Sequence, residues 1–371
     1  MRIQIGKGVP MNTKVLTILA ILFFPLLVHP CENKNWVDKS ENQILFSLEN
    51  KKKELSHQQD ELDCVFRFCM KQNFSRAVKY LLNNFVINIS VEDSFGFTPL
   101  MEAVELRHVE FAKLLLERGA DPDHKKIPCN ISTNGTRFGI SPFEVAILAN
   151  DLTMVELLLA HGADPNLQHC SELYLGSLPV IFLSISSGNP TIVSALIRSG
   201  ANINTKCVNS FGCFTPIYVS YSQKYDEVYD VLTQYGARIS KKNQEQAEFI
   251  RSVLSGDKEH MQLLYKPEFK HLRTIEGKTP VILAIESGNN LLVKELIRMD
   301  FDVNITDTFG RSPGVYALKK GDPKIVETVF CSKSFFLDYN YLGESYLSLA
   351  RKLRSKPAII EIVEKRSVDE K

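Results

Sequence analysis

A short pattern of residues recurs along the chain and constrains the fold more than any other feature of the sequence. One copy starts at Thr98-Pro99-Leu100, continues with apolar residues three and four positions apart, and ends at Gly119-Ala120-Asp121. Further copies start at Ser141-Pro142, Pro179, Thr215-Pro216, Thr279-Pro280 and Ser312-Pro313. A recurring unit of this kind predicts an array in which each unit packs against its neighbours, rather than one large core.

Each position of the pattern has a physical reason. Proline in the first helical turn loses no hydrogen bond, and the Thr or Ser before it caps the free amides. Apolar residues at spacings of three and four place one stripe along the second helix. The second helix then ends in a left-handed residue, which favours glycine and tolerates aspartate. The residues at this position are Gly119, Gly162, Gly200, Gly236 and Asp300.

The spacing between copies indicates the family. Pro280 and Pro313 are separated by one period of about 33 residues, whereas the interval from Pro99 to Pro142 is longer by an insertion of about ten. In order, period and residue type, residues 61–366 resemble the ankyrin repeat family. The resemblance implies an all-α fold, an ankyrin-repeat solenoid of about eight helix-turn-helix units with hairpin loops.

The array departs from the family pattern in two ways. The family usually has a histidine after Thr-Pro-Leu that ties adjacent turns together, and this chain has Met101, Glu144, Ile181, Tyr218, Ile282 and Val315 there. We therefore expect the stack to depend more on apolar packing. The gap between Pro216 and Pro280 requires a degenerate repeat that lacks the Thr-Pro start. For this repeat we expect two short helices at 247–254 and 261–265.

The N-terminal segment 1–30 is typical of an export signal. Arg2, Lys7 and Lys14 supply positive charge, and the stretch 15–28 is an uncharged apolar run. The length of this run suits a secretory signal and is shorter than the roughly 20 residues that span a bilayer. His29 and Pro30 stand where a cleavage site favours small residues. We expect a secreted or periplasmic protein, with an uncleaved membrane anchor as the alternative.

The segments around the array are expected to be less regular. Residues 31–60 are polar and lysine-rich, which predicts a linker that runs into a helix near Ile44. Residues 367–371 are expected to form a disordered tail. The domain organisation is then a signal peptide or short membrane anchor at 1–30, the linker, the repeat array at 61–366 and the tail.

Composition and the absence of catalytic motifs exclude several classes of protein. Lys plus Arg number 44 and Asp plus Glu 43, so no long-range field gathers phosphates, and we expect no nucleic acid partner. The sequence has no Gly-x-Ser-x-Gly and no His-Glu-x-x-His, which argues against an enzyme with catalytic residues. It also has no Cys-x-x-Cys pair, so we expect no metal site and no cofactor.

Three neighbouring hairpin loops, here called fingers, carry insertions at 124–137, 169–175 and 207–210. Insertions in ankyrin arrays enlarge one edge of the binding surface, so residues 123–214 are the expected partner-binding surface. The alternative is that the insertions are neutral sequence changes tolerated in surface loops. The candidate contact residues are aromatic residues before a glycine at a finger tip, together with one arginine of the longest finger. They are Phe95, Phe138, Phe211, Phe309 and Arg137. Aromatic residues before this glycine are also common in the family, which is the structural alternative.

The same fingers hold half of the eight cysteines. The disulfide candidates are Cys129, Cys170, Cys207 and Cys213. A bond between Cys207 and Cys213 would close across the turn at 210–212, although four cysteines allow three connectivities. Asn-x-Ser/Thr sequons also fall in the longest finger, and in a eukaryotic source we expect Asn130 and Asn134 to carry sugar.

Together these observations predict an exported ankyrin-repeat protein that binds a protein partner of unknown identity through its fingers and inner helices. We expect a monomer that contacts a membrane only if the N-terminal segment stays uncleaved. The alternatives are a membrane-tethered structural scaffold and, in a host-associated microbe, a host-directed secreted effector.

Overall fold

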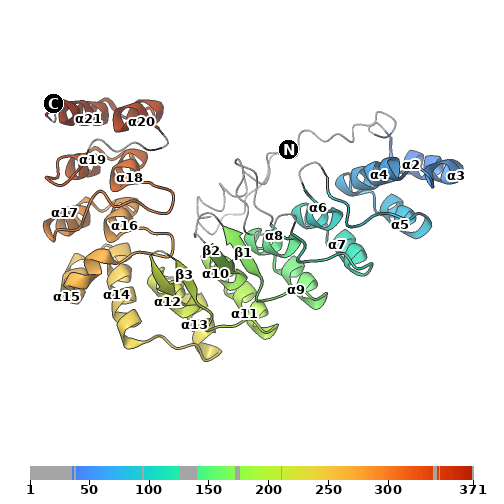
Figure 1. Ribbon diagram of the computed structural model, residues 1–371, viewed down its shortest axis with the longest axis horizontal. Coiled ribbons are helices and arrows are strands. Elements are labelled where there is room, and N and C mark those ends of the chain that lie inside the picture. Colours follow the sequence, from blue (N-terminus) through green and yellow to red (C-terminus); the bar gives the residue numbers. More distant parts are fainter. Residues whose placement is uncertain are drawn as a thin grey trace. The chain divides into compact units, whose positions relative to one another are not determined.

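The computed structural model describes residues 36, 39–93, 96–125, 140–171, 176–209, 211–336, 341 and 343–369. The chain divides into two compact units. Unit 1 comprises Met1–Cys170 and Pro179–Ala201, and unit 2 comprises Ser171–Leu178 and Asn202–Lys371. Each unit is built from helix pairs placed side by side (Figure 1).

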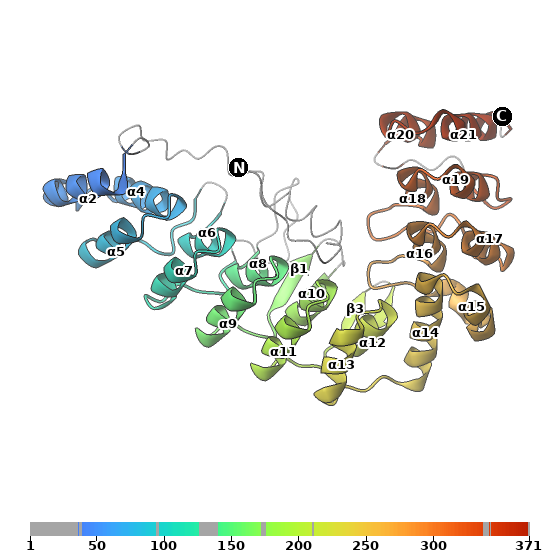
Figure 2. The same ribbon diagram turned by 180° about the vertical axis from the view of Figure 1, so that it is seen from behind.

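Unit 1 contains the first helix pairs of the array. Its helices are α2 (Glu41–Asn50), α3 (Lys52–Leu55), α4 (Gln59–Lys71), α5 (Ser75–Asn84), α6 (Pro99–Glu105), α7 (Val109–Leu116), α8 (Pro142–Leu148), α9 (Leu152–Ala160), α10 (Val180–Ser186) and α11 (Pro190–Arg198). Helices α6, α8 and α10 contact one another in sequence, and α7, α9 and α11 form a second row beside them (Figure 2). The finger between α9 and α10 contains strands β1 (Gln168–Ser171) and β2 (Gly176–Pro179).

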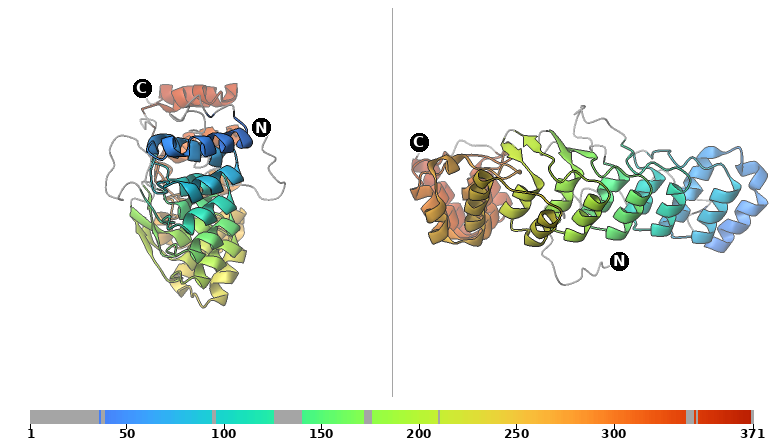
Figure 3. Two further views of the ribbon diagram at one scale, coloured as in Figure 1. Left: turned by 90° about the vertical axis from the view of Figure 1, so that its right-hand side faces the viewer. Right: turned by 90° about the horizontal axis from the view of Figure 1, so that it is seen from below.

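Unit 2 repeats this arrangement. It contains α12 (Pro216–Ser222), α13 (Asp226–Gln234), α14 (Lys241–Ser255), α15 (Lys258–Leu264), the 3-10 helix η3 (Pro267–His271), α16 (Pro280–Ser287), α17 (Asn290–Arg298), α18 (Pro313–Lys320), α19 (Pro323–Phe330), α20 (Tyr346–Lys352) and α21 (Pro357–Asp369). Successive first helices contact one another from α12 to α20, and α17, α19 and α21 form the second row (Figures 1 and 3). A hairpin of β3 (Cys207–Asn209) and β4 (Gly212–Phe214) precedes α12.

The helix boundaries confirm the expected chemistry of the repeat. The hydroxyl of Thr98 accepts a hydrogen bond from the Met101 amide, and Thr279 and Ser312 cap α16 and α18 in the same way. The residues that end the second helices have positive φ angles, from 64° at Asp300 to 99° at Gly200. A polar cap and a left-handed terminator therefore bound the pairs that begin with α6 and α16.

Five of the six positions where the family usually has histidine carry hydrophobic residues, and the sixth carries Glu144, a buried carboxylate. Met101, Ile181, Tyr218, Ile282 and Val315 are all buried. A Thr or Ser hydroxyl caps the helix start before four of these five residues, whereas α10, which contains Ile181, starts after Pro179 without a side-chain cap. Burial of apolar surface is therefore the main term that holds the stack together.

The degenerate repeat of unit 2 is more regular than the sequence indicates. Its first helix, α14, has 15 residues rather than a single short stretch, and Ser240 caps it through a hydrogen bond from the Asn243 amide. Gly256 ends α14 in the left-handed conformation, and Asp257 caps α15. A serine cap thus replaces the missing Thr-Pro start.

Both ends of the array are more structured than expected. Within the segment expected to be a linker, α2 and α3 are helical, and Ile44, Leu48 and Leu55 are buried. Helix α2 packs against α5, so it covers the first pair of the array. At the other end α21 continues to Asp369, into the segment expected to be a disordered tail.

Candidate protein-interaction surface

The fingers of unit 1 are anchored at their bases by buried charged side chains. Arg67 of α4 donates one hydrogen bond to the Glu102 carboxylate (2.7 Å) and two to the carbonyl oxygens of Val91 (2.6 Å) and Phe97 (2.9 Å). Val91 and Phe97 flank the first finger, so a single guanidinium bonds the backbone on both sides of it. Because Arg67 and Glu102 are buried, the pair has little competition from water.

Glu144 anchors the bases of two enlarged fingers through residues of unit 1. It is the third residue of α8, and the side chains of Ser141 and Glu144 each accept a hydrogen bond from the other residue's amide. This capping box fixes Oε2, which leaves Oε1 to accept from Lys125 Nζ (2.9 Å) and His169 Nδ1 (2.9 Å). The Glu144 side chain is 0% exposed.

Lys125 and His169 come from different fingers. Lys125 closes the described part of the finger that contains the 124–137 insertion, and His169 lies in β1 at the base of the next finger. Lys125 also donates to the carbonyl oxygen of Gln168 (2.5 Å), so it bridges the two bases directly. One buried carboxylate and one ammonium group therefore join the bases of both enlarged fingers.

The electrostatics of this cluster favour the ionised form of Glu144. Burial raises the pKa of Glu144, but the hydrogen bond and charge of His169, the charge of Lys125 and the Ser141 amide outweigh it, so the net pKa lies below its ordinary value. Asp123 behaves in the opposite way. Burial and the charges of Asp121, Asp164 and Glu144 raise its pKa to about 6, although Asp123 accepts a hydrogen bond from the Asp164 amide (2.7 Å).

The fingers of unit 2 are linked at their tips. Asn209 of β3 donates from Nδ2 to the carbonyl oxygen of Ile275 in the next finger (3.1 Å), while its Oδ1 accepts from the Phe211 amide (2.9 Å). In turn Thr308 of the following finger donates from its amide (3.2 Å) and its hydroxyl (3.1 Å) to the carbonyl oxygen of Glu276. The three tips form one chain of hydrogen bonds.

Gly277 permits the close approach of these tips. Its φ is +74°, and a Cβ there would lie 2.9 Å from the Phe211 ring and 3.0 Å from the Thr308 amide nitrogen. The Phe211 ring also lies 5.1 Å from the Arg273 guanidinium. Phe211 is thus half-buried between two fingers, where it packs within the protein and leaves little of its ring for a partner.

The other predicted contact residues have mixed outcomes. Phe309 is 38% exposed, with the Arg311 guanidinium 4.3 Å from its ring. Phe95, Phe138 and Arg137 lie outside the described residues. Val208 is not among the predicted contact residues, and its side chain is 70% exposed. It follows the buried Cys207 in β3, so its place in the strand directs this valine to the solvent-exposed face.

The hairpin register shows why the predicted disulfide within the third finger is not formed. Cys207 pairs with Phe214 across the hairpin, whereas Cys213 pairs with Val208. The two thiols therefore point to opposite faces, one buried and one exposed, and both are free. Burial raises the pKa of Cys207 to about 11, which keeps it protonated. Cys129, the Cys170 side chain, Asn130 and Asn134 lie outside the described part of the chain.

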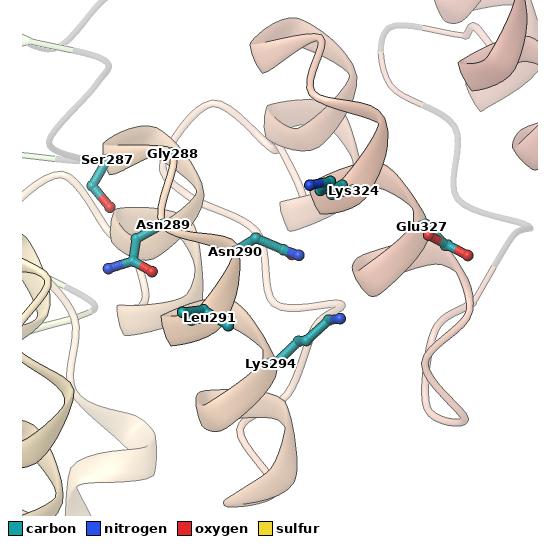
Figure 4. A pocket seen from close by; sticks show the side chains of 8 residues that line it. All are labelled: Ser287, Gly288, Asn289, Asn290, Leu291, Lys294, Lys324 and Glu327. Atoms are coloured by element: carbon teal, nitrogen blue, oxygen red, sulfur yellow. The ribbon is translucent and has the colours of Figure 1, made fainter.

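The search for other kinds of site gives three findings. Among the described residues, no group of His, Cys, Asp and Glu is arranged to hold a metal ion. No helix of the described ranges is long and apolar enough to cross a membrane. Unit 2 does contain a hollow of about 730 Å³ lined by the turn between α16 and α17 and by α19 (Figure 4).

Stacked helix pairs joined by hairpin fingers define a helical repeat protein of the binding type. Comparison with protein families matches the model for ankyrin repeats three times, at 37–126, 143–243 and 249–340. The chain belongs to the ankyrin repeats. Ankyrin repeats mediate protein–protein binding, and proteins built from them are typically non-enzymatic binding modules.

Similar solved structures include two ankyrin repeat domains. The domain of human ASB11 is 17% identical and covers 73% of this chain and 98% of its own length, with a TM-score of 0.30. The domain of Bcl-3, a member of the IkappaB protein family, is 21% identical and covers 72% of this chain and 99% of its own length, with a TM-score of 0.31. A search of curated proteins finds no match.

Proposed function

We propose that this ankyrin-repeat protein binds a protein partner through its fingers and inner helices, with the enlarged fingers at 124–137, 169–175 and 207–210 as the main contact segments. The observation that carries the proposal is the Glu144 cluster. A fully buried carboxylate joins the bases of two inserted fingers at Lys125 and His169, and fixed loop bases lower the entropy that is lost on binding.

The contact residues of this proposal combine sequence and structure. Phe138, Arg137 and Phe95 are proposed from the sequence as contacts at finger tips. Phe309 and Val208 are proposed because both are exposed on fingers of unit 2. Phe211 is proposed to act indirectly, since its ring packs against Gly277 and holds the tip in place.

A photo-crosslinking experiment tests the finger surface. A benzophenone amino acid is introduced at Val208 or at Phe138 in the full chain. The chain is irradiated in its native setting, and the proteins crosslinked to it are identified by mass spectrometry. The matched control is Leu263 on α15, which is 80% exposed but lies outside the fingers. The proposal predicts that both finger probes capture one common protein that the control does not. Equal capture from all three positions would show that the fingers have no special role.

We also propose that the N-terminal segment 1–30 directs export of the protein. The protein is proposed to act as a monomer that binds no nucleic acid and no cofactor and catalyses no reaction. The apolar run at 15–28 and the balanced net charge support this proposal. Fractionation with N-terminal sequencing tests the export step. A mature chain that begins near Cys31 in the exported fraction is the expected result, and an intact N-terminus in the membrane fraction would favour the tethered alternative.

A further inference from the structure

The hollow of unit 2 lies at the end of the helix pairs opposite the fingers. The finger at 274–278 precedes the start of α16, whereas the hollow adjoins Gly288, which ends α16. Its volume is about 730 Å³, and α17 and α19 form its two sides (Figure 4). It is therefore a surface separate from the finger contacts proposed above.

The polar groups that line this hollow are mainly hydrogen-bond donors. Asn290 lies 2.8 Å from the Thr328 hydroxyl, which also bonds the Lys324 carbonyl oxygen (2.7 Å), so the Asn290 amide keeps at least one N–H group for a ligand. The ammonium groups of Lys294 and Lys324 are exposed and have no partner within the described residues. In Figure 4 Asn290 and Lys294 extend from α17 toward α19. Because amide N–H and ammonium groups only donate, the hollow favours an acceptor.

The charge around the hollow has one predominant sign. Lys294 and Lys324 line it together with a single acid, Glu327. Lys320 adds a third cation at the rim, since its Cε lies 3.0 Å from where a Cβ of Gly288 would be. The free amides at the start of α17 contribute further partial positive charge. An anionic ligand is therefore favoured over a neutral or cationic one.

An exposed leucine among these cations further restricts the class of ligand that the hollow favours. Leu291, the second residue of α17, is 73% exposed and lines the same hollow. A small inorganic anion would leave this apolar side chain in water. A peptide that carries a carboxylate beside an apolar side chain would use both features, and covering Leu291 would add hydrophobic stabilisation.

We propose that this hollow binds an acidic segment of a protein partner, with a carboxylate between Lys294 and Lys324 and an adjacent apolar side chain on Leu291. The amide of Asn290 donates to the same carboxylate or to the peptide backbone. The site lies wholly within unit 2 and depends on no finger residue. The finger proposal therefore stands or falls independently of it.

Selection from a random dodecapeptide library displayed on phage tests the proposal. The full chain is the target, and the double variant Lys294→Glu/Lys324→Glu is used for counter-selection. The expected result is enrichment of peptides in which Asp or Glu lies close in sequence to Leu, Ile, Met or Phe. Recovery of peptides with no excess of acidic residues would overturn the proposal.

Binding of the most enriched peptide, labelled with fluorescein, is then measured by anisotropy. We expect about tenfold weaker binding to the double variant and about threefold weaker binding to Leu291→Ser, with affinity that falls as salt is added. The matched control is Lys241→Glu/Lys242→Glu, which makes the same change in net charge on exposed lysines at the start of α14.

Three outcomes contradict the proposal. Equal weakening by the control variant would show that net charge alone attracts the peptide. Unchanged binding to the Lys294→Glu/Lys324→Glu variant would place the peptide elsewhere. Full displacement by tripolyphosphate at the peptide's own concentration, with no effect of Leu291→Ser, would identify a phosphate site. Thermal melts by circular dichroism confirm that each variant is folded.

Discussion

In unit 1 the described contacts tie the fingers at their bases. In unit 2 neighbouring fingers are also tied at their tips, in addition to base contacts of Arg273 with the Thr306 carbonyl oxygen and of Arg311 with the Asp307 carboxylate. The bases of unit 1 are held by charged groups, with Arg67 on the first finger and Glu144 on the next two. The tips of unit 2 are held by neutral hydrogen bonds to the carbonyl oxygens of Ile275 and Glu276. A base anchor fixes where a loop starts, while a tip link makes neighbouring loops one continuous edge.

This difference assigns different roles to the two sets of fingers. The base-anchored fingers include the insertion at 124–137, the longest in the chain. The tip-linked fingers have shorter connections, and Phe211 is used to join them. A partner is therefore expected to find linked finger tips on unit 2 and fixed finger bases on unit 1. Each prediction below tests one side of this comparison.

The largest effect is expected from Glu144→Ala in unit 1. The change leaves Lys125 and His169 without their shared carboxylate, and we expect the unfolding free energy to fall by about 3 kcal/mol. Urea unfolding followed by circular dichroism measures this loss. Hydrogen exchange should accelerate at the bases of both enlarged fingers together.

The control for this prediction is Ser141→Ala, which removes the helix cap but keeps the carboxylate. Loss of a cap costs about 1 kcal/mol. If the two variants are equally destabilised, the capping box alone explains the role of Glu144, and the base anchor of unit 1 loses its energetic support.

A second prediction compares two glycines of unit 2 that have similar backbone angles. Gly277 has φ +74° and faces Phe211, whereas Gly321 has φ +69° and nothing within 4 Å of its Cβ position. Alanine at either site incurs the left-handed cost of about 1–2 kcal/mol. At Gly277 we expect about 1–3 kcal/mol more, because the methyl group separates the tips. Thermal unfolding of both variants gives the difference, and equal values would show that the tips separate without cost.

A smaller effect is expected when a single tip link is removed. Asn209→Asp keeps the acceptor for the Phe211 amide but replaces the donor to Ile275 with a carboxylate oxygen. We expect a loss of about 1 kcal/mol in urea unfolding, the value of one net hydrogen bond. Asn304→Asp is not a suitable comparison, since that amide also bonds Ser334 and Phe336. The better control is Asn243→Asp, on the exposed start of α14.

The sequence predicts the repeat because its signals are local. A Thr-Pro start and a left-handed glycine act within one helix end, so the caps of α6, α16 and α18 and the angle at Asp300 follow from neighbouring residues alone. The length of α14 was not predicted, because Ser240 caps that helix without the proline that identifies the other starts.

The finger anchors could not be predicted for a different reason. Lys125 and His169 lie 19 and 25 residues from Glu144, and they meet it only because both fingers fold back onto α8. The sequence does contain one signal, the Ser-x-x-Glu capping box before an apolar run. Phe211 was expected to be an exposed anchor, but the glycine that admits its ring, Gly277, belongs to a later finger that is distant in the sequence.

The last predicted effect depends on pH and concerns Asp123, which lies beside the base anchor of unit 1. Its pKa is raised to about 6 in the folded chain, against about 3.9 when unfolded, so the folded state binds the proton more tightly. Stability from this group is therefore present at low pH and is lost as pH rises from about 4 to about 6. Asp123→Asn keeps an oxygen for the Asp164 amide and removes the charge. We expect the variant to gain stability over the natural chain across this pH range, as measured by urea unfolding at pH 4 and pH 7. A gain of the same size at both pH values would mean that the charge of Asp123 does not oppose folding. The acidic side chains around the base of this finger would then be solvated, and the low-dielectric environment that the Glu144 anchor requires would be absent.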